Sequence, residues 1–337
     1  MPDASEPLTA TSSAGQWLEH PVGGPLLREL LAQAGMDESA LTPALGLPLQ
    51  TLADMSQGQM PQSVVDELVM AANGGTMPEF AVDPSLLAPT VPGRFADRTV
   101  IVTGAGSGIG RAVASRILRE GGRVIGVDIN ANGLQGLAEH VIGEQLVTVT
   151  ADLTKADDVA RVVAAASGVI DGLANIAGIV DDFSAIHEAS DAVWHRVFSV
   201  NVDGIFLLSR EVAAVMLAAG RGAIVNITSE AGLRGNAAGV AYTASKHAVI
   251  GISRSMACMY GASGIRTNAV APGGVATGMA PSAYAPFGTQ RLNPYMQLIT
   301  PVATAEQLAA SITFLLSDDA VNINGAILPS DGGWSVQ

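Results

Sequence analysis

The chain has 337 residues, of which 48% are hydrophobic and only 14% are charged, so it has ample apolar material for a large buried core. The single cysteine, Cys258, excludes an internal disulfide framework and a cysteine-rich zinc site, and it fits a reducing compartment. The net charge is −14, and residues 1–93 contribute −10 of it, from 11 acidic residues and one Arg. Such a segment is a poor ligand for nucleic acid or anionic lipid. The polar start predicts no signal peptide, and no apolar run is long enough for a membrane span, so we expect a cytoplasmic protein.

Residues 1–93 divide into three parts by composition. Residues 1–24 are predicted to be flexible, because Pro, Ser, Thr and Ala dominate there without periodicity. Residues 25–73 carry leucines and valines at helical spacing and are predicted to form a small helical segment. Residues 74–93 are rich in Gly and Pro, which predicts a linker.

The helical segment resembles a degenerate helix-turn-helix module of the repressor type. Its expected recognition helix, about 49–56, offers Gln50 and Asp54, whereas modules that read DNA carry basic residues for the phosphates. We therefore favour a role in packing or assembly over DNA binding, and we predict no nucleic-acid or membrane partner. A mobility shift with residues 1–93 at low salt would contradict this interpretation.

From Thr99 onward, apolar runs of strand length alternate with helical stretches, and residues 273–302 are predicted to be irregular. Buried strands that alternate with helices predict an α/β fold with a doubly wound, Rossmann-like parallel sheet, preceded by the all-helical N-terminal extension. Residues 94–337 would form this domain. The predicted strands are 99–103, 123–127, 146–150, 172–175, 223–228, 266–270 and 325–328, and the predicted helices are about 109–120, 155–166, 191–219, 241–260 and 304–316.

A glycine-rich loop at residues 103–110 (TGAGSGIG) follows the first predicted strand and opens a helix. Glycines allow a tight turn and close approach to a pyrophosphate, to which the helix N-terminus offers free N–H groups. Asp128 ends the second strand, 18 residues after Gly110, where a carboxylate binds ribose hydroxyls and repels a 2′-phosphate. No basic residue stands at Ser107 or just after Asp128, so the pattern favours NAD over NADP. The alternative is an ordinary tight turn and a solvated strand end.

Tyr242 and Lys246 are four residues apart on a predicted helix and therefore share one face. An ammonium beside a phenol favours the phenolate and lowers its pKa, so this tyrosine could exchange a proton near neutral pH. Ser229 follows a strand at the sheet edge where ligands bind, although a turn serine would look the same. Asn201 lies within the long helix, where it could hold a water or simply mark a kink.

Together these residues give residues 94–337 a resemblance to the short-chain dehydrogenase/reductase family, in its single-domain branch. Besides the glycine loop, Asn201, Ser229, Tyr242 and Lys246, the matching motifs are Asn175-Ile176-Ala177-Gly178, Pro272-Gly273 with Thr277, and Asp331-Gly332-Gly333. Ile176 departs from the family, which usually has a second Asn there.

The resemblance implies direct hydride transfer between NAD and a secondary alcohol or ketone. Tyr242 would be the general acid/base, and Lys246 would lower its pKa and bind the nicotinamide ribose. Ser229 would hold the substrate oxygen, and Asn201 a water in a proton relay. Thr277 and the backbone near Val275 would bind the carboxamide. The residues expected to contact NAD are Gly104, Ser107, Gly108, Ile109, Gly110, Asp128, Ile129, Asp152, Leu153, Asn175, Ala177, Gly178, Tyr242, Lys246, Pro272, Gly273, Val275 and Thr277.

The resemblance also implies a mobile lid between Gly278 and Thr300 and a homodimer or homotetramer, because the helices with Asn201 and Tyr242 commonly pack against a partner subunit. The lid residues suggest a medium-sized, mostly apolar substrate, cyclic or steroid-like, unless they pack on the protein or a neighbouring subunit. His187, His195 and His247 lack the spacing of metal ligands, so no metal is predicted. The apolar lid residues are Met279, Tyr284, Phe287, Leu292, Tyr295, Met296 and Leu298.

Two other functions remain open at this point. A 3-oxoacyl thioester reductase would need NADP and a basic patch for its carrier protein, which Asp128 and the acidic balance oppose. A cofactor-bound regulatory protein without chemistry would not need Asn201, Ser229, Tyr242 and Lys246 all intact.

Overall fold

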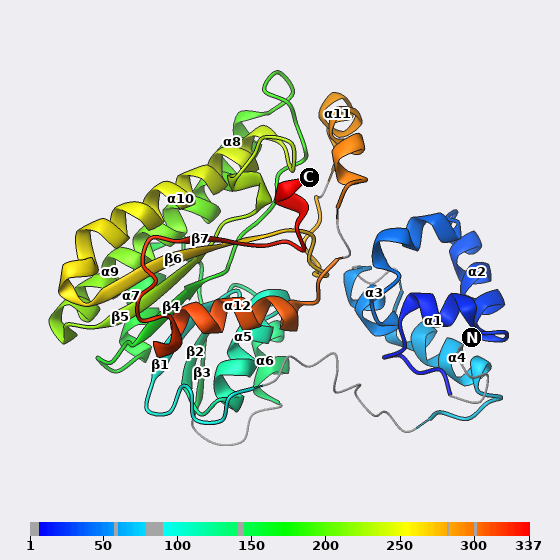
Figure 1. The fold of residues 1–337 in the computed structure, drawn as a ribbon, viewed down its shortest axis with the longest axis horizontal. Helices are drawn as coiled ribbons and strands as arrows, with labels where there is room; N and C mark the ends of the chain where they lie inside the picture. Colours follow the sequence, from blue (N-terminus) through cyan, green and yellow to red (C-terminus); the bar gives the residue numbers. More distant parts are fainter. Residues whose placement is uncertain (1–6, 57–59, 79–89, 140–144, 282, 300–301) are drawn as a thin grey trace.

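The computed structural model describes residues 7–56, 60–78, 90–139, 145–281, 283–299 and 302–337. Its main feature is a seven-stranded parallel sheet with the strand order β3-β2-β1-β4-β5-β6-β7 (Figure 1). The predicted α/β fold, with a doubly wound, Rossmann-like sheet after N-terminal helices, is confirmed. The strands are β1 Thr99–Thr103, β2 Arg123–Asp128, β3 Leu146–Thr150, β4 Gly172–Asn175, β5 Gly222–Ile227, β6 Ile265–Pro272 and β7 Ile327–Ser330.

Both faces of the sheet are buried, as the continuous apolar runs of its strands require. Side chains alternate along β1, so that Val100 and Val102 join one core cluster while Ile101 joins the other. Helices α5 (Gly108–Arg119), α6 (Ala131–Ala138) and α12 (Ala305–Leu316) contribute to the first cluster. Helices α7 (Ala156–Ala165), α9 (Gly204–Ala219) and α10 (Val240–Tyr260) contribute to the second.

The strand order reverses between β1 and β4, which makes this pair the topological switch point of the sheet. In open α/β sheets, ligands bind in the crevice outside the carboxyl ends of the strands at this point. The glycine loop follows β1, and residues 176–178 follow β4. The topology thus brings two of the predicted motifs to one edge.

Three elements differ from the sequence predictions. The helix predicted over 191–219 is interrupted, with α8 (Asp191–Phe198), a π-helical turn (Ser199–Asp203) and α9. Helix α6 was not expected, because Gly133 and Gly136 obscure its periodicity. Within the supposedly irregular 273–302 lies α11 (Pro286–Met296), whose pattern is hidden by an internal proline, Pro294.

The N-terminal helices are α1 (Ala14–Glu19), α2 (Gly23–Gln33), α3 (Leu49–Met55) and α4 (Gln62–Ala72), with a 3₁₀ helix at Glu38–Ala44. The prediction that residues 1–24 are flexible is wrong from residue 7 onward. Trp17 is fully buried with Leu8 and donates its indole N–H to the Thr9 carbonyl at 3.0 Å. Residues 1–6, and residues 79–89 of the predicted linker, lie outside the described residues.

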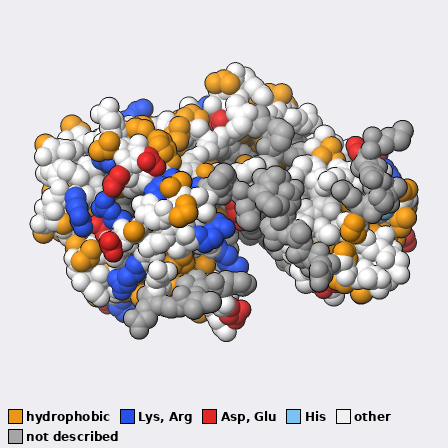
Figure 2. Space-filling view, turned by 60° about the horizontal axis from the view of Figure 1, so that its bottom comes forward, with side chains coloured by type: hydrophobic (Ala, Val, Ile, Leu, Met, Phe, Trp, Pro, Cys, Tyr) orange, Lys and Arg blue, Asp and Glu red, His pale blue; other side chains and the backbone are white. Residues whose placement is uncertain are grey.

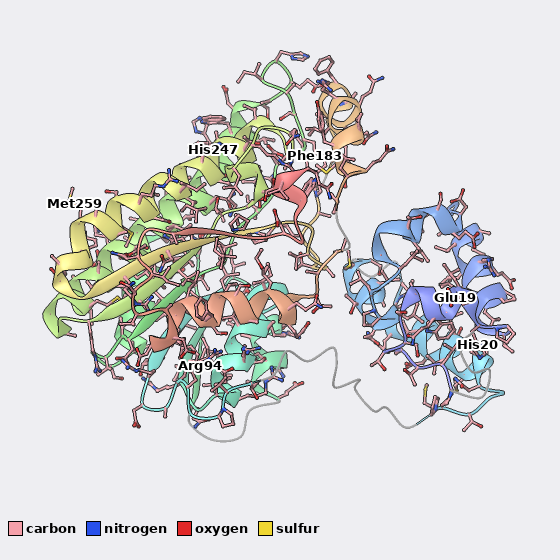
Figure 3. All side chains as sticks on the ribbon, viewed as in Figure 1. Glu19, His20, Arg94, Phe183, His247 and Met259 are labelled. Carbon is pink, nitrogen blue, oxygen red and sulfur yellow. The ribbon has the colours of Figure 1, made fainter. Side chains whose placement is uncertain are left out.

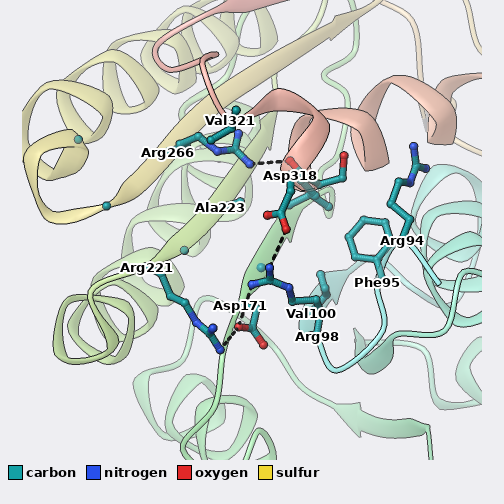
Figure 4. A pocket seen from close by; sticks show the side chains of 16 residues that line it. Arg94, Phe95, Arg98, Val100, Asp171, Arg221, Ala223, Arg266, Asp318 and Val321 are labelled. Carbon is teal, nitrogen blue, oxygen red and sulfur yellow. Dashed lines mark hydrogen bonds and ion pairs between the residues drawn. The ribbon is translucent and has the colours of Figure 1, made fainter. Parts of the chain in front are cut away.

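Ion pairs gather at the amino ends of the strands, opposite the switch-point crevice. Here a cavity of about 300 Å³ is lined by arginines and aspartates (Figure 4). Asp171 accepts the Thr99 N–H at 3.0 Å and pairs with Arg221 (2.9 Å) and Arg98 (3.6 Å). Arg266 donates to carbonyls at the end of α12. On the face shown in Figure 2, basic and acidic side chains likewise intermingle over the sheet domain. Through Asp171, these contacts connect the starts of β1, β4 and β5.

Candidate active site

A cavity of about 330 Å³ opens at the carboxyl ends of β1, β2 and β4. It brings together most of the residues predicted to contact a dinucleotide, although they come from widely separated segments. The predicted residues that line it are Gly104, Ser107, Gly108, Ile109, Gly110, Asp128, Ile129, Asp152, Leu153, Ala177, Gly178 and Thr277. Ile176 and Ile179 complete the wall beside Gly178.

The glycine loop is packed so closely that side chains would not fit. Gly104 and Gly108 have φ angles of +69° and +48°, a region that favours glycine. A Cβ at Gly110 would lie 2.1 Å from the Gly104 carbonyl oxygen, and one at Gly106 would lie 2.8 Å from Asp128 Oδ2. The N-terminus of α5 opens from this loop. The arrangement fits a pyrophosphate between the loop and the helix.

Polar groups fix the rim of this cradle. Asp128 accepts the N–H of Gly106 through Oδ2 and that of Asn130 through Oδ1, both at 2.9 Å. Arg111, which the sequence reading missed, donates to the carbonyls of Gly106 (2.7 Å) and Gly133 (2.9 Å). Hydrogen bonds from Thr154 lower the pKa of Asp152 at the far rim. The residues present therefore form a polar rim beside the glycine loop that suits a dinucleotide.

Tyr242, in the first turn of α10, is hydrogen bonded to Ser229, which follows β5. Burial raises the pKa of Tyr242 to about 12, and the Ser229 bond offsets only part of that rise. The phenol is therefore protonated at neutral pH. Two residues that are 13 positions apart in the sequence meet because one ends a strand and the other begins a helix.

Lys246 lies one helical turn after Tyr242, and it is 3% exposed. Its Nζ lies 5.4 Å from the centre of the Tyr242 ring and donates to the Ile227 carbonyl at 2.9 Å. Burial lowers the pKa of Lys246 to about 8. The expectation that its ammonium lowers the pKa of Tyr242 is not met in this structure, because burial dominates and the ammonium faces the ring and a carbonyl.

Asn201 lies in the π-helical turn, so the kink reading was correct in part. Its Oδ1 accepts the Ile179 N–H at 2.9 Å, and its Nδ2 donates to the Ile179 carbonyl and to Ser245 Oγ. A Cβ on Gly178 would lie 3.2 Å from Asn201 Oδ1 and 3.5 Å from Lys246 Nζ. Gly178 also lines the dinucleotide cavity, so it lies between this cavity and the side chains of Asn201 and Lys246.

Some predicted contact residues take structural positions. The buried amide of Asn175 donates to Ser209 Oγ (3.0 Å) and to Asn226 Oδ1 (2.8 Å) inside the fold. Pro272 ends β6, and the Gly273 N–H donates to the Ser330 carbonyl. Val275 forms an isolated bridge with Ala303.

Buried acids around the site were missed by the sequence reading. Glu230, directly after Ser229, is 1% exposed and pairs with Arg234, while burial raises its pKa. Asp181 is equally buried and bonds to the start of α10. The only sequence signal for these acids is their position, since Glu230 follows Ser229 and Asp181 follows the motif at residues 175–178.

Within the described parts of the chain, no group of three or more His, Cys, Asp or Glu side chains is arranged to hold a metal ion. Among the helices that the structure describes, none is long and apolar enough to cross a membrane.

Residues 98–286 match the family described as short chain dehydrogenase. The chain belongs to this family. This short-chain dehydrogenase is 37% identical over 257 residues to the short-chain dehydrogenase/reductase cdmF of Talaromyces verruculosus, which covers 72% of this chain and 99% of the relative. It is 35% identical over 255 residues to levodione reductase of Leifsonia aquatica, covering 72% of this chain and 96% of that one.

Solved structures agree with this assignment. A crystal structure of levodione reductase superposes with a TM-score of 0.65 at 35% identity, covering 72% of this chain and 99% of that one. A 3-ketoacyl-(acyl-carrier-protein) reductase from Brucella melitensis complexed with NADH gives 0.64 at 28% identity, over 71% and 99% of the two chains. The short-chain dehydrogenase described here therefore has the fold and the general dehydrogenase/reductase role of its family.

Proposed function

We propose that this chain transfers a hydride between NAD(H) and a secondary alcohol or ketone. The observation that carries the proposal is the hydrogen-bonded pair of Tyr242 and Ser229, with Lys246 beside it and Gly178 linking Lys246 to the dinucleotide cavity. A bound nicotinamide would supply or accept the hydride at the substrate carbon. The chain's own residues would handle the oxygen and its proton.

In the reductive direction, the phenol of Tyr242 would donate its proton to the substrate oxygen while Ser229 Oγ holds that oxygen. The pKa of about 12 keeps the phenol in the proton-donating form at neutral pH. In the oxidative direction, the phenol would first release its own proton toward solvent along the path that Lys246 and Asn201 line, and the resulting phenolate would accept the hydroxyl proton. Lys246, with a pKa near 8, can change its charge close to neutral pH and return the proton. Asn201 would hold a water on the path from Lys246 to solvent.

NAD is preferred over NADP in this proposal because of Asp128. Its carboxylate lies at the rim where the ribose hydroxyls would bind, and a 2′-phosphate would meet its negative charge. The nearby guanidinium of Arg111 is held by two backbone carbonyls rather than presented at the rim. Relatives use both cofactors, since one neighbouring structure contains NADH and another contains NADP at low occupancy.

The substrate is proposed to be medium-sized and mostly apolar. Around α11, the side chains of Met279, Tyr284, Phe287 and Leu298 are about half exposed, although they are apolar. Covering an apolar substrate would remove them from water. Two relatives are named for cyclic or steroid compounds, levodione reductase and the 3beta-hydroxysteroid dehydrogenase 2 of Eggerthella lenta, which is 36% identical over 249 residues.

The test is a panel of cyclohexanols, linear secondary alcohols and 3β-hydroxysteroids with NAD or NADP. We expect NADH formation with the cyclic members and a strong preference for NAD. The competing function is 3-oxoacyl thioester reduction, which the NADH-bound structural neighbour represents. Faster turnover of an acetoacetyl thioester, with either NADH or NADPH, would replace our proposal by that one, and binding of NADH without any turnover would favour a regulatory protein.

We also propose a homodimer or homotetramer in a reducing, cytoplasmic compartment. Phe206 and Leu217 on α9 and Met259 on α10 are large apolar side chains that this single chain leaves exposed. Cys258, which precedes Met259, is a free and exposed cysteine and fits a reducing compartment. Sedimentation equilibrium that finds a monomer at micromolar concentration would contradict the oligomer.

A further inference from the structure

The helix that carries Tyr242 and the helix within the proposed lid both begin without a capping side chain of their own. The N-cap of α10 is Gly239 and that of α11 is Ala285, and neither side chain can accept a hydrogen bond. The first N–H groups of a helix have no partner within the helix, so they need one from elsewhere. Both helices find it in residues 181–188, which we call the cap loop.

At α10, the cap loop supplies a distant substitute for a capping box. Asp181 accepts the Gly239 N–H through Oδ1 (3.2 Å) and the Tyr242 N–H through Oδ2 (2.9 Å). The carbonyl of Ser184 accepts the Val240 N–H at 2.9 Å. In an ordinary capping box the same two positions of the helix, N-cap and N3, are satisfied locally. Here a single buried carboxylate satisfies both, and the N3 residue is Tyr242 itself.

Gly239 is the counterpart of this carboxylate. A Cβ there would lie 2.5 Å from Asp181 Oδ2 and 2.7 Å from the Ser184 nitrogen, so any side chain would displace the cap loop. Gly239 has no side chain with which to cap α10, and for the same reason it leaves room for the carboxylate of Asp181.

At α11, Glu188 has the same role. It accepts the Phe287 N–H through Oε1 and the Gly288 N–H through Oε2, both at 2.9 Å. The Asp182 carbonyl accepts the Ala285 N–H at 2.8 Å. Phe183, labelled beside α11 in Figure 3, makes an edge-to-face contact with Tyr284 at 5.5 Å. Its φ of +61° is unusual for a phenylalanine, so the surrounding contacts hold the loop in this conformation.

We propose that Asp181 is a positioning residue for Tyr242, and that Glu188 anchors the lid helix from the same loop. The inference rests on the proposed roles of Tyr242 and of the lid. Asp181 fixes the backbone of Tyr242 and thereby the distance of its phenol from Ser229, so it affects the chemical step. Glu188 fixes the start of α11, so it affects retention of the substrate.

The experiment compares Asp181→Asn, Glu188→Gln and the control Asp182→Asn, whose carboxylate bonds within the cap loop to the Ser184 N–H. Steady-state kinetics would use NAD and the panel alcohol that the wild type oxidises fastest. Oδ1 of Asp181 accepts the N–H groups of Gly239 and Phe183, so in Asp181→Asn the amide oxygen should keep that position. The Tyr242 N–H would then face the new amide NH₂, and losing a bond to a charged group corresponds to about tenfold. We expect kcat to fall about tenfold with KM little changed, whereas Glu188→Gln should raise KM with kcat little changed.

Hydrogen exchange at the first turn of α10 provides a readout that does not need activity. We expect the Tyr242 N–H to exchange about tenfold faster in Asp181→Asn than in Asp182→Asn. Gly239→Ala, which should displace the carboxylate without removing it, is the second variant and should show the same two effects.

The proposal would be overturned if the Tyr242 N–H exchanged equally fast in Asp181→Asn and Asp182→Asn. It would also be overturned if Asp181→Asn and Glu188→Gln changed kcat and KM in the same way. If the wild type oxidised no alcohol but the Tyr242 N–H still exchanged faster in Asp181→Asn, the capping contact of Asp181 would stand and the proposed function would be refuted.

Discussion

Replacing Lys246 by Met should stabilise the folded protein near neutral pH while it removes activity. Lys246 is 3% exposed, and its burial lowers the pKa from 10.5 to about 8. A shift of this size corresponds to roughly 3 kcal/mol of unfolding free energy that the buried ammonium costs when it is charged. Losing its bond to the Ile227 carbonyl costs about 1 kcal/mol. We therefore expect a net gain of about 2 kcal/mol at pH 7.

The pH dependence gives this prediction its sign. Because the pKa of Lys246 is lower in the folded state, the unfolded chain binds more protons between pH 8 and pH 10.5, and wild-type stability rises through that window. The advantage of Lys246→Met should therefore shrink as the pH rises from 8, and reverse once the lysine is neutral in both states.

Urea unfolding of the two proteins at several pH values measures the difference. Lys155→Met is the matched control, because Lys155 is the only other lysine and its side chain is 68% exposed. It should change stability by less than about 0.5 kcal/mol. A Lys246→Met protein that is less stable than wild type at pH 7, or whose advantage does not depend on pH, would refute the reasoning.

Three further predictions concern other parts of the structure. Tyr242→Phe should lose turnover by about a thousandfold while it still binds NADH in a fluorescence titration, and retained turnover would contradict the role given to Tyr242. Asp128→Ala should lower the ratio of kcat/KM for NAD to that for NADP, since it removes the charge at the ribose rim; an unchanged ratio would exclude that role. Asp171→Asn should lower the unfolding free energy by about 2 kcal/mol, less than for a fully buried pair because its partner Arg221 is 60% exposed. A urea midpoint equal to that of wild type would show that the ion pairs at this edge contribute nothing measurable.

The sequence was sufficient for the fold and for the parts of the site that local motifs encode. The glycine loop and the Tyr242/Lys246 pair are contiguous signals, and the parallel topology alone brings the strand ends together. Asp181 and Gly239 are 58 residues apart, and neither belongs to a recognisable motif. Their contact becomes visible only when the loop after β4 is placed against α10.

Other differences have equally physical causes. The composition of residues 7–24 suggested flexibility, yet Leu8 and Trp17 are buried with the leucines of α2, which no local periodicity reveals. The spacing of Tyr242 and Lys246 predicted a shared face correctly, but not the pKa of the phenol. That pKa depends on how deeply the phenol itself is buried, which a single helix does not determine.

The charged side chains around Asp171 lie at the amino ends of the strands, whereas Tyr242 lies near the carboxyl ends, so the full length of the strands separates them. Changes that strengthen or weaken this rim should alter how well the protein resists heat without touching the hydride-transfer geometry. Thermal stability and substrate preference could therefore be changed by substitutions at two separate edges of the sheet.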